Sequence, residues 1–145
     1  MAHHLFNFSG DQDEAVACLR ARMWGIVADE RYRDALAAGD LALIYVPASC
    51  GGFIGRAGLA TSVHEWTPSE AEAFPGDSPG GVLLSDVERW ERAVPMATVV
   101  ARVDPTGSNP VVQANARAGF GTGVVRITAG EYEAAVAASR EFQHS

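Results

Sequence analysis

The sequence predicts an α+β fold, in the form of a mixed β-barrel of five to six short strands with flanking short helices. Strand-like and helical segments follow one another without the regular alternation of a parallel α/β sheet. Gly55 and Gly58 interrupt an apolar run, which is typical of bent or bulged strands in tightly curved sheets. With 145 residues, 48% of them hydrophobic, the chain has the size of one domain around one core. Residues 1–145 are therefore expected to form a single domain.

The N-terminal segment is expected to form a strand, a helix and a short extended piece. Phe6 and Phe8 point to one side of a strand predicted over Leu5–Ser9. A turn with a helix cap follows. Apolar spacing of i, i+3, i+4 and i+7 then predicts a helix over Glu14–Arg22, with acids first and arginines last, as the helix dipole prefers. Met23–Ile26 is the extended piece.

The middle of the chain carries the strongest strand signals. A second helix is expected over Glu30–Ala38, ended by a glycine. The near-continuous apolar run Leu41–Val46 predicts a central strand. A loop over Pro47–Gly52 then leads into a partner strand over Phe53–Ala60.

The rest of the chain is expected to contain two helices, two strands and one ambiguous segment. A Thr-Pro-Ser-Glu sequence is typical of a capped helix start, and a stretch rich in proline and glycine predicts a loop. The expected elements are a helix over Thr67–Phe74, a loop over Pro75–Gly81, a strand over Val82–Trp90, a helix or strand over Pro95–Val103, a strand over Gly123–Thr128 and a closing helix over Glu131–Phe142.

Charge excludes several function classes. Eleven basic and eighteen acidic residues give a net charge of −7, and every basic residue is an arginine. Such an acidic chain has no general attraction for phosphate backbones, so a non-specific nucleic-acid coat is not expected. The absence of lysine excludes Schiff-base chemistry, P-loop phosphate binding and lysine general-base mechanisms.

Cysteine usage and hydropathy predict a reduced, cytoplasmic setting. Cys18 and Cys50 lie far apart and have no partner at metal-binding spacing, so neither a disulfide framework nor a metal site is predicted. Cys18 is expected to be a buried helix residue and Cys50 a loop residue. No membrane span or secretory signal is expected, and no cofactor is implied.

Segments from Leu5 to Thr128 occur in a specific order and spacing. A first strand ending at Ser9 is followed fifteen residues later by Trp24. A Gly-Asp-Leu-Ala-Leu-Ile-Tyr run leads into the central strand, and a Gly-Gly-Phe-Ile-Gly-Arg-Ala run follows it. Together with residues 87–96 and 123–128, these segments resemble the YTH/EVE group of PUA-like domains. The resemblance implies a PUA-like barrel with a pocket for a methylated or hydroxymethylated nucleobase flipped out of DNA or RNA.

The resemblance assigns a base-binding pocket to six residues, some of which have a plainer alternative. Trp24 is the leading aromatic wall or else a core tryptophan, and Trp66 is a second wall in a loosely matching loop. Leu83 or Val82 is the apolar third wall or barrel core. The full set is Trp24, Gly25, Trp66, Ser9, Asn7 and Leu83.

One position departs from the YTH pattern. Many YTH domains carry an asparagine where this chain has Gly10, which favours the broader EVE expectation over N6-methyladenine reading.

Four other aromatic residues are expected to pack in the core rather than to bind a base. These are Tyr45, Phe53, Trp90 and Phe120.

Arginines are the candidates for phosphate contacts, because a guanidinium can grip a phosphate with two hydrogen bonds. Four of them flank Trp24 in the sequence, and the alternative is that they lie on solvated helix faces. The candidates are Arg20, Arg22, Arg31, Arg33 and Arg56.

Three functions remain open at this point. The first is a reader of modified bases, for which a protein partner could supply additional basic surface. The second is a hydrolase acting on small modified nucleosides, as in the ASCH branch, but the lysine that such enzymes depend on is absent. The third is a protein-interaction domain without base binding. No Ser-His-Asp set and no carboxylate pair predicts a catalytic site.

Overall fold

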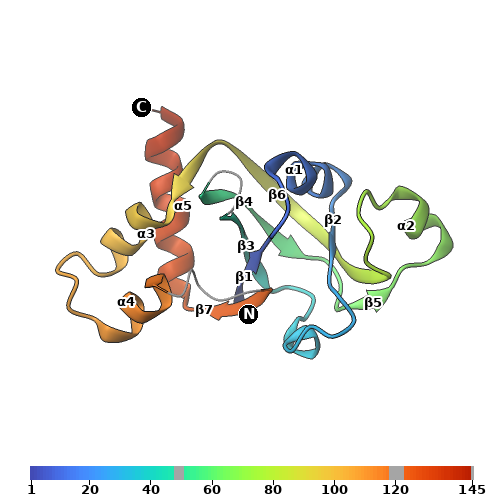
Figure 1. Cartoon of the computed structure of the whole chain (residues 1–145). Coiled ribbons are helices and arrows are strands. Elements are labelled where there is room, and N and C mark those ends of the chain that lie inside the picture. Colours follow the sequence, from blue (N-terminus) through green and yellow to red (C-terminus); the bar gives the residue numbers. More distant parts are fainter. Residues whose placement is uncertain (48–50, 118–122, 145) are drawn as a thin grey trace.

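The computed structural model describes residues 1–47, 51–117 and 123–144. It contains a strongly curved mixed sheet with helices packed on both faces (Figure 1). The strands are β1 (His3–Asn7), β2 (Met23–Gly25), β3 (Leu41–Val46), β4 (Gly52–Leu59), β5 (His64–Glu65), β6 (Gly80–Pro95) and β7 (Val124–Ile127). The helices are α1 (Gln12–Ala21), α2 (Pro68–Ala73), α3 (Met96–Val103), α4 (Pro110–Arg117) and α5 (Ala129–His144), with a 3-10 turn, η1, at Arg33–Ala35.

The strand order is β2-β6-β4-β3-β1-β7, and β5 also pairs with β6. β1 and β3 are parallel and the other pairs are antiparallel. The predicted α+β class and mixed sheet are confirmed, as are the irregularities in β4, where the register shifts between Phe53 and Gly55 and between Arg56 and Gly58. The predicted barrel of five to six strands is a curved sheet of seven strands that does not close, since β2 and β7 do not pair within the described residues.

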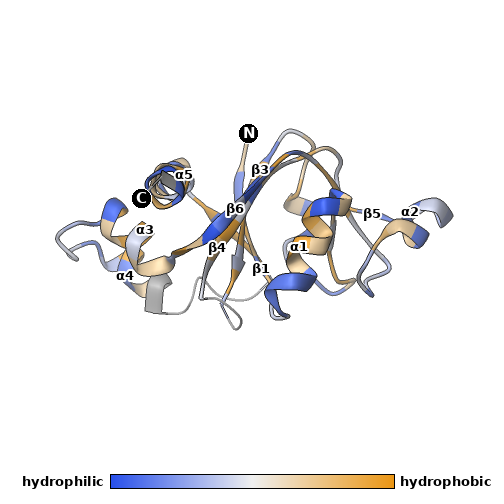
Figure 2. Cartoon of the chain, turned by 90° about the horizontal axis from the view of Figure 1, so that it is seen from above, coloured by the Kyte–Doolittle hydropathy of each residue, from blue (hydrophilic) through white to orange (hydrophobic). Residues whose placement is uncertain are grey.

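Two hydrophobic clusters lie on opposite faces of the sheet, because neighbouring side chains of a strand point to opposite faces. The first core lies on the side of α1 and β2 and includes Phe6 of β1. The second core lies on the side of α3 and α5 and includes Leu5 of β1. β1 was predicted to have one apolar face, but it has two. Figure 2 shows α1 and α2 over one end of the sheet and α3, α4 and α5 over the other.

Local capping signals were reliable. Asp11 caps α1 by accepting a hydrogen bond from the Glu14 backbone N–H at 2.9 Å. Thr67 and Glu70 form a reciprocal capping box at the start of α2. The ambiguous segment after Pro95 is a helix, α3, while the short strand β5 and the helix α4 were not predicted.

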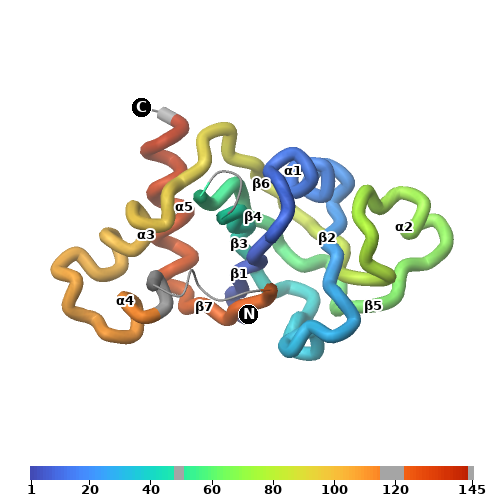
Figure 3. The backbone as a smooth tube through the Cα atoms, in the orientation of Figure 1, coloured from blue at the N-terminus to red at the C-terminus, as the bar shows by residue number. Residues whose placement is uncertain are grey.

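Two predictions in the N-terminal half are wrong. The helix expected over Glu30–Ala38 is reduced to the single turn η1. The Glu30 carboxylate accepts hydrogen bonds from the backbone N–H of Tyr32 at 2.8 Å and of Val124 at 2.7 Å, so it holds an irregular segment beside β7. Figure 3 shows this segment running from β2 towards β7. Arg22, which the sequence places at the i+7 position and end of the helix over Glu14–Arg22, lies instead at the C-terminal cap of α1, exposed, with a left-handed φ of 58°.

The first strand is fixed at its start by a buried carboxylate. Asp40, which is 6% exposed, accepts hydrogen bonds from His4 Nε2 at 2.8 Å and from the backbone N–H groups of Ala2 at 3.0 Å and Ala37 at 3.1 Å. Burial by itself would raise the pKa of Asp40, but these hydrogen bonds outweigh it and lower the pKa below its ordinary value of 3.8. The carboxylate therefore ties β1 to the turn before β3.

Among the described helices, none has the length and apolar character needed to cross a membrane. Several predicted core residues are confirmed as buried, namely Cys18, Tyr45, Phe53 and Trp90. Cys50 and Phe120 lie outside the described residues.

Candidate functional site

A cavity of about 1110 Å³ lies on the side of the sheet covered by α1. Its walls come from the end of β1, one side of α1, β2 with the residues after it, and the segment that follows α2. Ligand sites are usually about 300–1,000 Å³ in volume, so the cavity has room for a nucleobase and its sugar. The residues used below are Phe6, Asn7, Phe8, Ser9, Asp11, Asp13, Glu14, Cys18, Trp24, Gly25, Glu30, Phe74, Asp77 and Ser78.

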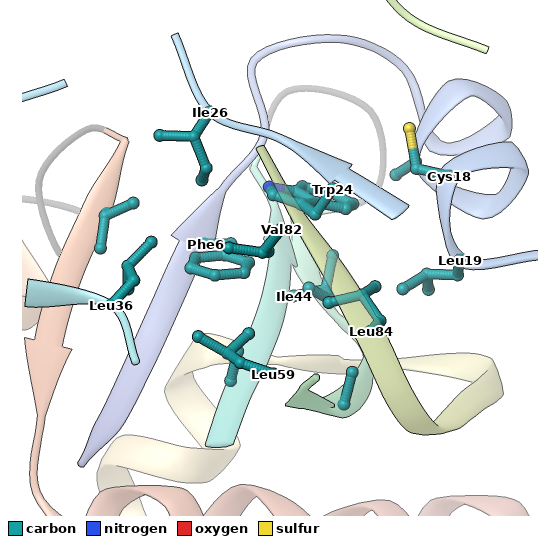
Figure 4. Packing of buried hydrophobic residues seen from close by; sticks show 14 of the residues in the cluster. Phe6, Cys18, Leu19, Trp24, Ile26, Leu36, Ile44, Leu59, Val82 and Leu84 are labelled. Carbon is teal, nitrogen blue, oxygen red and sulfur yellow. The ribbon is translucent and has the colours of Figure 1, made fainter. Parts of the chain in front are cut away.

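Trp24 forms the floor of this cavity. Its ring lies stacked on Phe6, with 5.9 Å between centroids, and meets Phe8 edge-on at 5.5 Å. Figure 4 shows the indole over the Phe6 ring, close to Val82 of β6. Trp24 is only 5% exposed and packs in the first core, and it also lines the cavity. It is therefore both a core residue and part of the cavity wall.

Gly25 allows the segment after α2 to close over the cavity. A Cβ at this position would lie 2.8 Å from Phe74 Cζ and closer still to the Ser78 hydroxyl. Ser78 in turn donates a hydrogen bond to the Gly80 carbonyl at 2.9 Å. A larger residue at position 25 would therefore force the side chains of Phe74 and Ser78 to shift.

Asn7 and Ser9 both line the cavity, at the point where β1 ends. The backbone N–H of Asn7 donates to the Gly123 carbonyl at 2.9 Å, which fixes the strand end against β7. The structure thus brings together four of the six predicted pocket residues, namely Asn7, Ser9, Trp24 and Gly25.

The remaining two predicted pocket residues do not line the described part of the cavity. Trp66 lies behind Phe74, with 5.0 Å between ring centroids, and its Nε1 is buried with no hydrogen-bond partner among the described residues. Leu83 pairs with Met23 in the sheet and is half-buried. Trp66 therefore contacts the cavity wall from behind, through Phe74 and through the hydrogen bond that its backbone N–H donates to the Pro79 carbonyl at 3.0 Å.

None of the five candidate arginines lines the described cavity. Arg20, Arg22 and Arg31 are exposed, and Arg33 donates to the Ala28 carbonyl at 3.1 Å. Arg56 lies on the opposite face of the sheet, where it forms an ion pair with Glu88 at 2.9 Å and contacts Tyr132 of the second core. Its alternation in β4 places it there, away from Trp24.

Sequence patterns did not indicate the aromatic and acidic parts of the lining. Phe74 was treated as the end of a helix, and the acids at the start of α1 were interpreted only as complements to the helix dipole. Burial is the main cause that raises the pKa of the Cys18 thiol, and the nearby charge of Glu14 raises it further. The available signal was the spacing of Asp11, Glu14 and Cys18, which places them on one side of α1.

The acidic residues are not arranged as a metal centre. No group of three histidines, cysteines, aspartates or glutamates that could hold a metal ion occurs in the described ranges. The arrangement instead suits a flat organic ligand, with aromatic rings for stacking and small polar groups for hydrogen bonds.

No protein-family model matches the chain, and no curated protein matches its sequence. Solved structures share its fold. Rpa0253 from Rhodopseudomonas palustris is 19% identical and covers 99% of this chain and 97% of its own, with a TM-score of 0.62. Human THYN1 protein in complex with 5-methylcytosine-containing DNA is 16% identical, covering 97% and 98%, with a TM-score of 0.61. ASCH from Zymomonas mobilis is 12% identical, covering 94% of each chain, with a TM-score of 0.55.

At these identities the likeness concerns the fold alone. The chain shares its mixed α+β fold with the solved structures of THYN1 and ASCH. The sheet and the flanking helices match over nearly the whole length of both chains.

Proposed function

We propose that this chain is an EVE-type binding module whose cavity receives a single modified nucleobase flipped out of a nucleic-acid strand. The observation that carries the proposal is the cavity beside Trp24, in which aromatic rings stand next to Asn7, Ser9 and Ser78. The same fold occurs in human THYN1 in complex with 5-methylcytosine-containing DNA, which supports a methylated base in DNA as the ligand.

The aromatic lining offers the free energy that base flipping requires. Extruding a base costs a few kcal/mol, and stacking on an aromatic side chain returns about 1–3 kcal/mol per base. Trp24 is almost fully buried, whereas Phe8 and Phe74 are half-buried. The two phenylalanines therefore provide most of the contact surface, with Trp24 beneath them. A buried methyl group adds roughly 0.8 kcal/mol, which gives a preference for the modified base.

Phosphate contacts would come from outside the cavity. Arg20 and Arg22 lie at the far end of α1, and Arg31 lies on the segment after β2. With so few arginines, we expect a shallow dependence of affinity on salt. A partner protein is a second source of basic surface in this proposal.

Titration with short oligonucleotides tests the proposal. The panel carries cytosine, 5-methylcytosine, 5-hydroxymethylcytosine or N6-methyladenine, and binding is followed by tryptophan fluorescence and by anisotropy of labelled strands. We expect one modified base to bind best. The fluorescence change should disappear in Trp24→Phe and persist in Trp90→Phe, since Trp90 lies in the second core.

A matched pair of phenylalanine variants tests the cavity itself. Phe8→Ala should weaken the preferred oligonucleotide roughly tenfold or more, from the loss of one stacking surface. Phe142→Ala, which removes another half-buried phenylalanine on α5, should leave the affinity unchanged. Equal affinity for all four strands and for a strand whose base is methylated on a ring nitrogen, in a folded protein, would contradict the proposal, and turnover of a modified nucleoside would favour the hydrolase alternative.

A further inference from the structure

The cavity is acidic as well as aromatic. None of its described lining residues is an arginine or a histidine, and the chain contains no lysine. The acidic lining residues are Asp11, Asp13, Glu14, Glu30 and Asp77.

The carboxylates of Asp13, Glu14 and Asp77 are exposed, and the first two lie in the first turn of α1, where they complement the helix dipole. Asp11 caps α1, and Glu30 holds the backbone of Tyr32 and Val124. By contrast, Asp13, Glu14 and Asp77 form no ion pair within the described ranges. Their charges are therefore available to a ligand.

Glu14 places its charge beside the aromatic lining. A Cβ added at Gly10 would lie 2.9 Å from Glu14 Oε2 and 2.7 Å from the Phe8 ring. The Glu14 carboxylate and the Phe8 ring are therefore both next to Gly10. The charge of Glu14 also contributes to the raised pKa of Cys18 on the cavity wall. The electrostatic potential at this wall is therefore negative.

The N-terminus of α1 does not reverse this potential. A helix N-terminus is equivalent to roughly half a positive charge, whereas its first residues here contribute Asp11, Asp13 and Glu14. One of these accepts a backbone hydrogen bond, and the full negative charges outweigh the partial positive charge. A phosphate would be repelled from this end of the cavity.

We propose that the base received by the cavity carries a positive charge, as does a heterocycle methylated on a ring nitrogen. This inference rests on the proposed function and specifies its ligand class. A cation over an aromatic ring is attracted by the ring electrons, and the attraction increases when water is excluded. Carboxylates such as Glu14 beside the Phe8 ring add to it. A methyl group on the pairing edge also prevents base pairing, which lowers the cost of flipping.

Two methylcytidine isomers provide the test. 3-Methylcytidine is a cation at neutral pH, whereas 5-methylcytidine contains the same methyl group on a neutral ring. Each is titrated as the free nucleoside and within an otherwise identical oligonucleotide, by calorimetry and anisotropy. We expect the cationic isomer to bind roughly 10- to 30-fold more tightly.

Charge variants show whether the acidic lining causes this preference. Asp13→Asn with Glu14→Gln should reduce it to less than about threefold while leaving the Asp11 cap in place. Glu72→Gln with Glu91→Gln changes the net charge equally at exposed positions outside the cavity, and should keep the full preference.

The possible outcomes separate the two proposals. Equal or tighter binding of the neutral isomer would overturn the inference and leave the base-binding function standing. A preference retained in the Asp13 and Glu14 variant would also overturn it. Absence of binding by every nucleoside and oligonucleotide would overturn both. A preference seen only with oligonucleotides supports the inference for a base held in a strand. A preference seen only with free nucleosides supports a cationic ligand but contradicts the proposed flipping of a base out of a strand.

Discussion

Replacing Asp40 with alanine should destabilise the fold strongly. The substitution removes the acceptor of three hydrogen bonds, from His4, Ala2 and Ala37. Hydrogen bonds to a charged group contribute about 1.5–3 kcal/mol each and are not additive. Removing one partner of a buried pair costs about 3–5 kcal/mol. We therefore expect the free energy of unfolding to fall by about 3–5 kcal/mol in urea denaturation at pH 7.

The pH dependence of this loss provides a second check. The pKa of Asp40 is lower in the folded chain than its ordinary value of 3.8. Its contribution is therefore complete above that value and is lost as the pH falls through the lower folded pKa. The difference between the native chain and Asp40→Ala should shrink in that acid range, and His4 is the titratable group that faces the carboxylate.

The control is Asp29→Ala, which truncates an exposed aspartate and should change the free energy of unfolding by less than about 0.5 kcal/mol. The loss of stability in Asp40→Asn should lie between those of Asp40→Ala and Asp29→Ala. The asparagine oxygen can still accept a hydrogen bond, but its NH₂ group would face one of the groups that donate to Asp40. A loss below 1 kcal/mol for Asp40→Ala, or a loss that is independent of pH, would refute the reasoning.

Three further predictions concern the cavity and its surroundings. Thr67→Ala removes the capping box of α2 and should cost about 1 kcal/mol in thermal or urea unfolding; an unchanged midpoint would contradict the capping role. Gly25→Ala should displace the segment that bears Ser78, costing about 1–3 kcal/mol and altering oligonucleotide affinity in anisotropy titrations. Glu30→Ala removes two hydrogen bonds to backbone N–H groups and should cost about 2–3 kcal/mol. Hydrogen exchange at the Val124 amide should accelerate in this variant, and unchanged protection there would show that Glu30 is dispensable.

Elements with a complete local signal could be predicted from the sequence. The apolar run of β3 and the capping box of α2 need no distant residue to explain them. The helix expected over Glu30–Ala38 fails because Glu30 bonds to Val124, 94 positions away. Strand β6 continues to Pro95, beyond the predicted end at Trp90, because its last residues pair with the start of β4. Such long-range partners leave no mark on local periodicity.

The candidate site could be predicted only in part for a similar reason. Trp24, Gly25, Asn7 and Ser9 were found because a family resemblance supplied their spatial relation. Phe74 and Asp77 join them only when the segment after α2 folds back over β2. The arginines were selected by their nearness to Trp24 in the sequence, which does not fix the face of the sheet on which a side chain lies. Arg56 shows this most clearly.

The position of β1 between β3 and β7 has a consequence for the order in which the chain can fold during synthesis. β1 leaves the ribosome before both of its neighbours, and its antiparallel partner β7 follows all the other described strands in the sequence. Its end, which leads to Asn7 and Ser9 at the cavity, is therefore unpaired on one side until residues 124–127 have emerged. Such distant pairings slow folding. A ligand can meet a finished cavity only after translation of β7, so chains interrupted before that strand should neither bind a base nor be stabilised by one.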